Sequence, residues 1–303
     1  MTRRILALVV AALGIACACG RRDEAARPMI QNKGSDTMVN LAQAWAEEYR
    51  EVDPDVAIAV TGGGSGTGIA SIINGTVDVA NASREIKPEE KEAARKSTGK
   101  DVVEHVVAFD ALAIYVHAAN PIPSISRGQL ACVYAETGGC TKWTDLGVEV
   151  PGCSKQKIVR VGRQNNSGTY AYFREWVLGT RQDFKLGSLD MQGSKDVVDV
   201  VERTPCAIGY SGMGYRTPGV RVACVAGEEG DPCVEPTAET AATGKYPISR
   251  GLYMYTLGEP TGAVARFLAW VRSDAGQASV ARLGYAPLPP ERRTAPERRT
   301  GAP

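Results

Sequence analysis

The chain has few histidines and almost no net charge. Its 303 residues include two His, and its 35 Lys and Arg against 34 Asp and Glu give a formal net charge of +1. His105 and His117 sit in apolar runs typical of strands, and no C-x-x-C pair occurs, so a zinc site is not expected. No basic block stands out in the part expected to fold, which argues against a nucleic-acid partner. We therefore expect no metal, no other cofactor and no nucleic acid.

The sequence also lacks the usual groups of a hydrolase or a nucleotide-binding enzyme. No nucleophile is paired with a plausible base, because both histidines lie in the strand-like runs. The glycine-rich stretch "TGGGSGTG" lacks the Lys-Ser/Thr ending of a phosphate-binding P-loop. We expect a binding protein and not an enzyme.

The N-terminus has no apolar run long enough to span a membrane. Its apolar stretch, residues 5–16, is about a dozen residues long, follows two arginines and ends at Cys17 and Cys19. We predict that residues 1–18 are a lipoprotein signal peptide, that Cys17 or Cys19 is lipidated, and that residues 19–28 are a polar tether. The protein is then expected in the periplasm or at the surface of a bacterial cell, held to the membrane by a lipid anchor only.

Six further cysteines fall in the middle and late part of the chain. Since an exported protein can oxidise its thiols, we expect three disulfides. The sequence leaves the pairing open, although Cys224 with Cys233 and Cys132 with Cys140 would close short loops.

Alternating strand-like and helix-like segments predict an α/β protein with mixed sheets, and the length suits roughly two domains. The segment 103–121 reads as two apolar strands divided at Asp110. Residues 289–303 are rich in Pro and Arg and are predicted to be a disordered tail.

Three predicted helices begin with the same polar chemistry at the end of a strand. Ser35-Asp36-Thr37 precedes one helix, Ser65 can cap a second, and Ser167-Gly168-Thr169 begins a third, four residues after Arg163. A helix N-terminus offers unpaired N–H groups to an anion, and an Arg fork suits a tetrahedral oxyanion. Strand ends from separate parts of an α/β sheet can meet at one point. The alternatives are ordinary capped helices and, at Gly62 to Gly64, a flexible turn.

Several segments together resemble the periplasmic phosphate-binding proteins of bacterial phosphate ABC transporters. The segments, in that family's order, are "KGSDTM", "GGGSGTGIASIINGTVDVANASREIK", "VAFDALAIYVHAANP", "GRQNNSGTYAYF", "AIGYSGMGY" and "YPISRGLYMYT". The resemblance implies a type II periplasmic-binding-protein fold. Lobe 1 would comprise residues 29–116 and 249–288, lobe 2 would comprise residues 117–248, and two crossing strands would join them.

The resemblance also implies the ligand, the partner and most of the site. Inorganic phosphate would be enclosed between the lobes and delivered by a monomer to the permease subunits of an ABC transporter. Matching the family's motifs gives Thr37, Met38 and Ser65 in lobe 1, and Arg163, Ser167, Gly168 and Thr169 in lobe 2. The hydroxyl-cap argument adds Ser35.

One position departs from the family's pattern. Arg84 stands where well-known members carry an Asp that accepts the proton of hydrogen phosphate and so rejects sulfate. We include Arg84 among the expected anion contacts and look elsewhere for the acceptor, at Asp36 and Asp110. Asp110 is placed slightly ahead, because Asp36 has a helix to cap, and Asp110→Asn is expected to change selectivity more than stability. A sulfate- or molybdate-binding protein, a phosphatase using the same anion seat, and a signalling protein on this fold remain alternatives.

Overall fold

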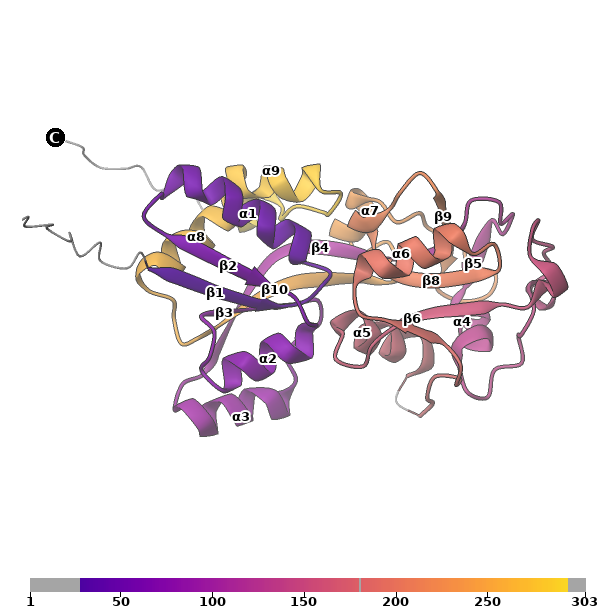
Figure 1. Cartoon of the computed structure of the whole chain (residues 1–303), viewed down its shortest axis with the longest axis horizontal. Helices are drawn as coiled ribbons and strands as arrows, with labels where there is room; N and C mark the ends of the chain where they lie inside the picture. Colours follow the sequence, from indigo (N-terminus) through magenta and orange to yellow (C-terminus); the bar gives the residue numbers. More distant parts are fainter. Residues whose placement is uncertain (1–27, 180, 294–303) are drawn as a thin grey trace, which may run out of the picture.

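The computed structural model describes residues 28–179 and 181–293, which form two lobes side by side along the long axis (Figure 1). Both lobes are built on a sheet that mixes parallel and antiparallel strands, with helices on its faces. Lobe 1 contains β1 (Met29–Gly34), α1 (Val39–Val52), β2 (Ala57–Thr61), α2 (Ser65–Ile73), β3 (Val79–Ala82), α3 (Pro88–Thr98), the first part of β4 (Val102–His117), β10 (Ser249–Leu257), α8 (Gly262–Val271) and α9 (Asp274–Arg282).

Lobe 2 holds the remaining elements, seen on the right of Figure 1. They are the end of β4, β5 (Ser124–Ser126), α4 (Arg127–Tyr134), η1 (Trp143–Leu146), η2 (Ser154–Gln156), β6 (Val159–Arg163), α5 (Gly168–Leu178), β7 (Leu189–Met191), α6 (Ser194–Arg203), β8 (Ala207–Gly212), η3 (Met213–Tyr215), β9 (Val220–Ala226) and α7 (Ala238–Ala242).

In lobe 1 the strand order is β2-β1-β3-β10-β4, with β1 parallel to both neighbours and β10 antiparallel to both of its neighbours. Helices α1, α8 and α9 cover one face through buried residues such as Trp45 and Phe267. Helix α2 covers the other face through Ile69 and Ile72, with α3 packed beside it. The buried apolar residues of α1 and α2 recur at the spacing of one helix face, and these faces pack on the sheet.

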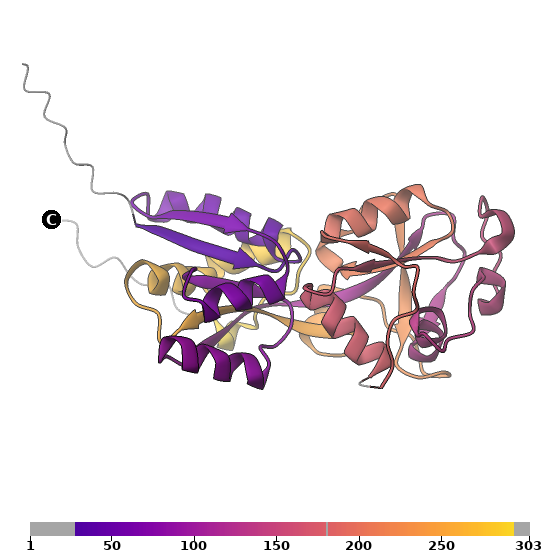
Figure 2. The same cartoon turned by 60° about the horizontal axis from the view of Figure 1, so that its bottom comes forward.

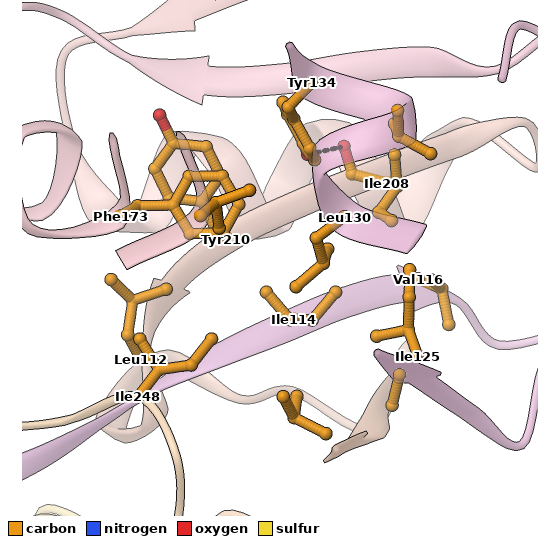
Figure 3. Packing of buried hydrophobic residues seen from close by; sticks show 14 of the residues in the cluster. Leu112, Ile114, Val116, Ile125, Leu130, Tyr134, Phe173, Ile208, Tyr210 and Ile248 are labelled. Carbon is orange, nitrogen blue, oxygen red and sulfur yellow. Dashed lines mark hydrogen bonds between the residues drawn. The ribbon is translucent and has the colours of Figure 1, made fainter. Parts of the chain in front are cut away.

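In lobe 2 the end of β4 pairs with both β8 and β9, β6 lies parallel to β8 and β7, and β5 lies parallel to β9. Leu112, Ile114 and Val116 of β4 point into a core that α4 and α5 close with Tyr134 and Phe173 (Figure 3). The disulfides Cys132–Cys140, Cys153–Cys206 and Cys224–Cys233 all lie in this lobe. The expectation of three disulfides is confirmed, including both short loops.

The two lobes are joined where β4 changes partners. Its residues up to Ala111 pair with β10, and from Leu112 onward they pair with β8. The returning chain runs beside this point, since the Leu112 N–H donates to the carbonyl of Ile248 over 2.9 Å. Figure 2 shows β4 and the chain leading to β10 passing together from one lobe to the other. The predicted α/β fold, with two lobes and two crossing segments, is confirmed.

The expected division of this region at Asp110 is wrong. β4 is one continuous strand of 16 residues, and Asp110 lies inside it with its carboxylate buried against Arg250. A polar residue did not end the strand here because an ion pair satisfies it. The predicted lobe boundary at residue 116 falls within the part of β4 that pairs with β8 and β9.

Only a few residues of the two predicted terminal segments lie in the described part of the chain. The predicted signal peptide, its cysteines and almost all of the tether lie outside the described residues. The predicted disordered tail is wrong at its start, because η4 (Pro290–Arg292) forms a short turn and Arg293 pairs with Asp274. The rest of the tail lies outside the described residues. Within residues 28–179 and 181–293, no helix is long and apolar enough to cross a membrane.

Candidate functional site

Hydroxyl groups from three segments of lobe 1 meet at its surface toward lobe 2. Ser35 follows β1, Ser65 begins α2, and Ser83 follows β3. The Ser35 Oγ donates to the Ser83 Oγ over 2.9 Å, and the Ser65 Oγ accepts from the Ser83 N–H over 3.0 Å. All three residues are buried. Because β1 and β3 are parallel neighbours, their carboxyl ends bring these hydroxyls to one edge of the sheet.

The start of α5 in lobe 2 packs directly against this edge. The Thr169 Oγ1 lies 2.9 Å from the Thr37 Oγ1 of lobe 1, in a buried hydrogen bond between the lobes. A Cβ atom at Gly168 would overlap the hydroxyls of Ser65 and Ser83, so only glycine permits this approach. We call this group of residues the hydroxyl cluster; its members are Ser35, Thr37, Ser65, Ser83, Gly168 and Thr169.

Arg163, at the end of β6, is fully buried beside the hydroxyl cluster. Its Nη1 donates to the Ser194 Oγ over 2.8 Å, and its Nη2 donates to the carbonyl of Gln192 over 2.6 Å. The same Nη2 lies 3.1 Å from the Oδ2 of Asp36, which belongs to lobe 1. Burial lowers the pKa of Arg163, the charge of Asp36 opposes that effect, and the like charge of Arg250 adds to it.

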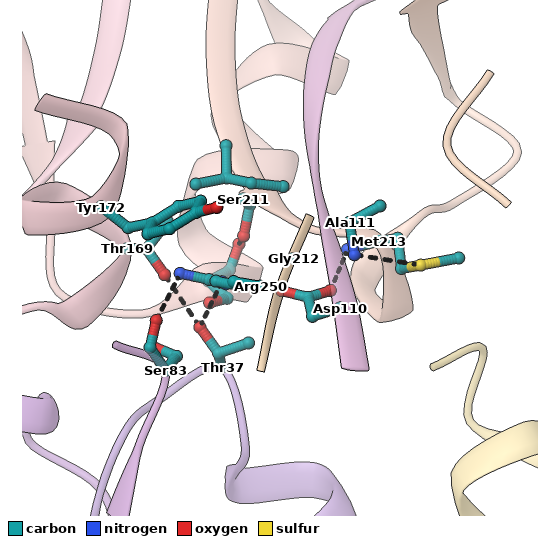
Figure 4. A network of polar contacts seen from close by, with 12 residues as sticks. Thr37, Ser83, Asp110, Ala111, Thr169, Tyr172, Ser211, Gly212, Met213 and Arg250 are labelled. Carbon is teal, nitrogen blue, oxygen red and sulfur yellow. Dashed lines mark hydrogen bonds and ion pairs between the residues drawn. The ribbon is translucent and has the colours of Figure 1, made fainter. Parts of the chain in front are cut away.

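Arg250 of β10 brings a second buried guanidinium to the hydroxyl cluster (Figure 4). Its Nη2 donates to the Thr37 Oγ1 over 3.3 Å, and its Nη1 donates to the carbonyl of Ser83 over 3.1 Å. Its Nε and Nη2 both donate to the Oδ2 of Asp110, at 3.0 and 2.7 Å. Burial raises the pKa of Asp110, and Arg250 together with the N–H of Met213 counteracts that rise.

Charge and hydrogen-bond donors are therefore concentrated at one buried place between the lobes. Two guanidinium groups, each paired with one carboxylate, lie beside a group of hydroxyls, most of which precede or begin a helix. Such a set of donors is suited to a small oxyanion, because each oxygen can accept several hydrogen bonds. Among the described residues, no group of three or more His, Cys, Asp or Glu is placed to hold a metal ion.

A hollow of about 900 Å³ opens beside the hydroxyl cluster on the solvent side. Its lining includes Lys87 and Arg250 of lobe 1 and Asn165 and Tyr172 of lobe 2. The Arg250 guanidinium lies 5.9 Å from the centre of the Tyr172 ring, and the Tyr172 hydroxyl donates to the carbonyl of Ser249. Arg250 and Tyr172 thus form a wall between the hydroxyl cluster and the hollow.

Comparison with known proteins identifies the family. The PBP superfamily domain matches residues 21–275. The phosphate-binding protein PstS of Pseudomonas aeruginosa is 37% identical over 86% of this chain and 83% of its own length, and that of Bacillus subtilis is 32% identical over 94% and 93%. The chain belongs to the PstS family of phosphate-binding proteins.

Solved structures of the PstS type agree with the fold. A putative phosphate ABC transporter substrate-binding protein from Clostridium perfringens, with bound phosphate, superposes with a TM-score of 0.76 at 27% identity, covering 86% of this chain and 100% of that one. An ABC-type phosphate transport receptor from Vibrio cholerae gives 0.66 at 25% identity, covering 85% and 99%. The type II periplasmic-binding-protein fold is thereby confirmed. The names of these proteins describe binding proteins and receptors, not enzymes.

Most of the residues expected to contact the ligand of a PstS protein come together. The structure places Ser35, Thr37, Ser65, Gly168 and Thr169 in the hydroxyl cluster, with Arg163 beside it. Ser167 sits at the N-cap of α5 as predicted, where its Oγ accepts from the N–H groups of Thr169 and Tyr170. The expected cap at Ser65 is wrong, because Gly64 occupies the N-cap of α2 and leaves the Ser65 hydroxyl available to Ser83.

Met38, Asp110 and Arg84 were expected to contact the anion, but each lies outside the hydroxyl cluster. The Met38 side chain is buried in the lobe 1 core, and its N–H donates to the carbonyl of Ser35. Asp110 contacts Arg250 and the backbone of Met213 and does not lie at a chain reversal.

Arg84 is not in the hydroxyl cluster. Its guanidinium forms two hydrogen bonds with Glu90 in the first turn of α3, at 2.8 and 2.6 Å. Burial alone would raise the pKa of Glu90, but hydrogen bonds from Arg84 and the Lys87 backbone hold it below its ordinary value. A nearby carboxylate holds this guanidinium outside the hydroxyl cluster, although Arg84 still lines the hollow between the lobes.

Two residues at the hydroxyl cluster, Ser83 and Arg250, were not among the predicted site residues. Ser83 directly precedes Arg84, and no local pattern distinguishes its hydroxyl. Arg250 lay in the quoted segment "YPISRGLYMYT", and a lone charge at the start of an apolar strand was its only local signal. Such a charge needs a buried partner, and that partner, Asp110, is far away in the chain.

Proposed function

We propose that the protein binds inorganic phosphate between its two lobes and delivers it to the membrane subunits of an ABC transporter. The observation that carries this proposal is that two buried guanidinium groups meet lobe 1 at the same turn: Arg250 donates to the Thr37 hydroxyl, and Arg163 of lobe 2 pairs with the neighbouring Asp36. The close relatives named phosphate-binding protein PstS, and the related structure with bound phosphate, support inorganic phosphate as the ligand.

The proposed phosphate contacts come from both lobes. They are the hydroxyls of Ser35, Thr37, Ser65, Ser83 and Thr169, the backbone at Gly168, and the guanidinium groups of Arg163 and Arg250. Ser167 contributes through the N-cap that orients the first turn of α5. Arg84 and the Met38 side chain are not part of this proposed site, for the reasons given above.

Asp36 is the proposed acceptor for the proton of hydrogen phosphate. Its Oδ1 accepts from the Gly63 N–H over 2.8 Å and its Oδ2 lies beside Arg163, so each oxygen retains a lone pair for a further donor. Asp110 is less suited, because its Oδ2 already accepts two hydrogen bonds from Arg250 and its Oδ1 accepts from Met213. Its proposed role is to hold Arg250 in position.

The surroundings of the hydroxyl cluster favour binding without catalysis. In the described part of the chain, His105 contacts Thr256 within lobe 1 and His117 contacts the Ala119 N–H at the end of β4. Neither imidazole is placed to activate a cluster hydroxyl. Incubation with a chromogenic phosphate ester tests the phosphatase alternative, and we expect no release of the chromophore.

The proposal includes a location and a mode of action. The protein is a monomer held by a lipid on Cys17 or Cys19 at the outer face of a bacterial membrane. Its lobes move as two bodies about the crossing near Leu112 and Ile248, and phosphate favours the closed arrangement because it contacts both lobes.

Calorimetric titration with phosphate, sulfate and molybdate tests this function. Measurements are made at two pH values on either side of the second phosphate pKa, with wild type and Asp36→Asn. We expect wild type to prefer phosphate, and Asp36→Asn to lose part of its preference over sulfate. Tighter binding of sulfate or molybdate by wild type would overturn the proposed ligand. An unchanged ratio in Asp36→Asn would instead make a hydroxyl or carbonyl the proton acceptor.

A further inference from the structure

A further contact joins the lobes outside the hydroxyl cluster, at the rim of the interface. It is formed by Gly63 and Gly66 of lobe 1 and the exposed residue Asn166 of lobe 2. The Gly66 N–H donates to the carbonyl of Asn166 over 2.9 Å, and the Asn166 Nδ2 donates to the carbonyl of Gly63 over 2.9 Å. We call this pair of hydrogen bonds the rim contact.

The rim contact depends on glycine in lobe 1. Gly64 has a φ of +91°, and a Cβ there would lie 2.6 Å from the carbonyl oxygen of Asn166. A Cβ on Gly66 would lie 3.2 Å from the same oxygen, closer than an ordinary van der Waals contact. The N-terminus of α2 and the chain before α5 therefore pack closely against each other across the interface between the lobes (Figure 1).

Each partner in the rim contact is next to a member of the phosphate-binding machinery. Gly66 follows Ser65, and Asn166 precedes Ser167, the N-cap of α5. The two hydrogen bonds join different lobes, so they are made only when the lobes are closed together. Contacts made in one of two states shift the equilibrium toward that state, and a ligand's apparent affinity falls with the population of its competent state.

We propose that Asn166, through the rim contact, is a positioning residue that sets the affinity for phosphate without touching the anion. This inference rests on the proposed function. The rim contact stabilises the closed arrangement in which both lobes reach the ligand. Its loss speeds the release of phosphate, leaves capture by the open form unchanged, and leaves the choice between phosphate and sulfate unchanged.

Gly66→Ala tests the inference by placing a methyl group in the rim contact. Overpacking of this kind is expected to weaken phosphate binding about five- to a hundredfold. Alanine is a better helix former than glycine, so the variant is expected to be at least as stable as wild type when no phosphate is present. The matched control is Gly128→Ala. Gly128 is likewise the second residue of its helix, α4, but a Cβ there would have only the Ser126 Oγ nearby, at 3.8 Å.

Asn166→Ala is a second, exposed variant that removes one of the two hydrogen bonds. Phosphate binding is expected to weaken roughly two- to tenfold. Stopped-flow measurement should assign the change to the dissociation rate in both variants. Titration with sulfate should show the same proportional loss, since the rim contact does not touch the anion.

Small-angle scattering at saturating phosphate completes the test, with Gly66→Ala expected to remain more open than wild type. Phosphate affinity in Gly66→Ala equal to that of wild type and Gly128→Ala would overturn the inference. So would a loss confined to the association rate. Failure of wild type itself to bind phosphate would instead overturn the proposed function, and the two failures are therefore distinguishable.

Discussion

Replacing Arg163 by methionine removes the buried cation that lobe 2 brings to the proposed phosphate site. Methionine keeps much of the side-chain volume but none of the donors that reach Asp36, Ser194 and the carbonyl of Gln192. Removing one member of a buried charge pair typically costs about 2 to 5 kcal/mol of binding free energy. We therefore expect phosphate affinity to fall roughly thirtyfold to a few thousandfold.

The substitution also affects folding, because it leaves the Asp36 carboxylate without its counter-ion. The double variant Arg163→Met with Asp36→Asn separates the two effects. Removing the unpaired charge should recover part of the free energy of unfolding lost in Arg163→Met, but not the phosphate affinity. Urea denaturation measures the stability of each variant, and calorimetry measures binding.

Arg160→Met is the matched control for these variants. Arg160 lies on the same strand, β6, but its guanidinium donates to the carbonyl of Leu186, away from the hydroxyl cluster. It should bind phosphate as wild type does. Equal phosphate affinities of Arg163→Met and Arg160→Met would refute the assignment of Arg163 to the site.

The remaining predictions concern stability, pH and anchoring. Asp110→Asn leaves Arg250 without its buried partner and should lower the free energy of unfolding by about 3 to 5 kcal/mol; an unchanged urea midpoint would contradict the ion-pair role. Glu90 has a lowered pKa, so its stabilising contribution is present above the ordinary carboxyl pKa and is lost as pH falls through the lowered value. Glu90→Gln should therefore lose stability at neutral pH and converge with wild type in acid, and parallel stability curves across that pH range would count against it. Of Cys17→Ser and Cys19→Ser, one should release the protein from the membrane fraction; retention of both would argue against a lipid anchor on these residues.

Local sequence patterns were sufficient to predict the general class of the fold and the start of α5. The Ser167 hydroxyl makes the predicted cap of that helix. Both short disulfide loops were also within reach, since cysteines close in sequence need no knowledge of the fold. Each of these features depends on residues within about ten positions of one another.

What the sequence did not reveal depends on which side chains pair, in two cases across segments far apart in the chain. Asp110 was read as a break because an unpaired carboxylate inside an apolar strand is costly, and nothing nearby reveals that Arg250 pairs with it. Arg84 was placed at the anion by its position in a motif, whereas Glu90, six residues later, determines where its guanidinium lies. Asp36 was considered as a cap or an acceptor, but its pairing with Arg163 joins the two lobes and has no local signature.

A crystal structure of the protein grown with phosphate tests the proposed site most directly. We predict one phosphate between the lobes, within hydrogen-bond distance of the Arg163 and Arg250 guanidinium groups and of the Thr37 and Thr169 hydroxyls. Phosphate bound elsewhere, for example only in the hollow beside Tyr172, would contradict it. So would an anion that contacts the residues of one lobe alone.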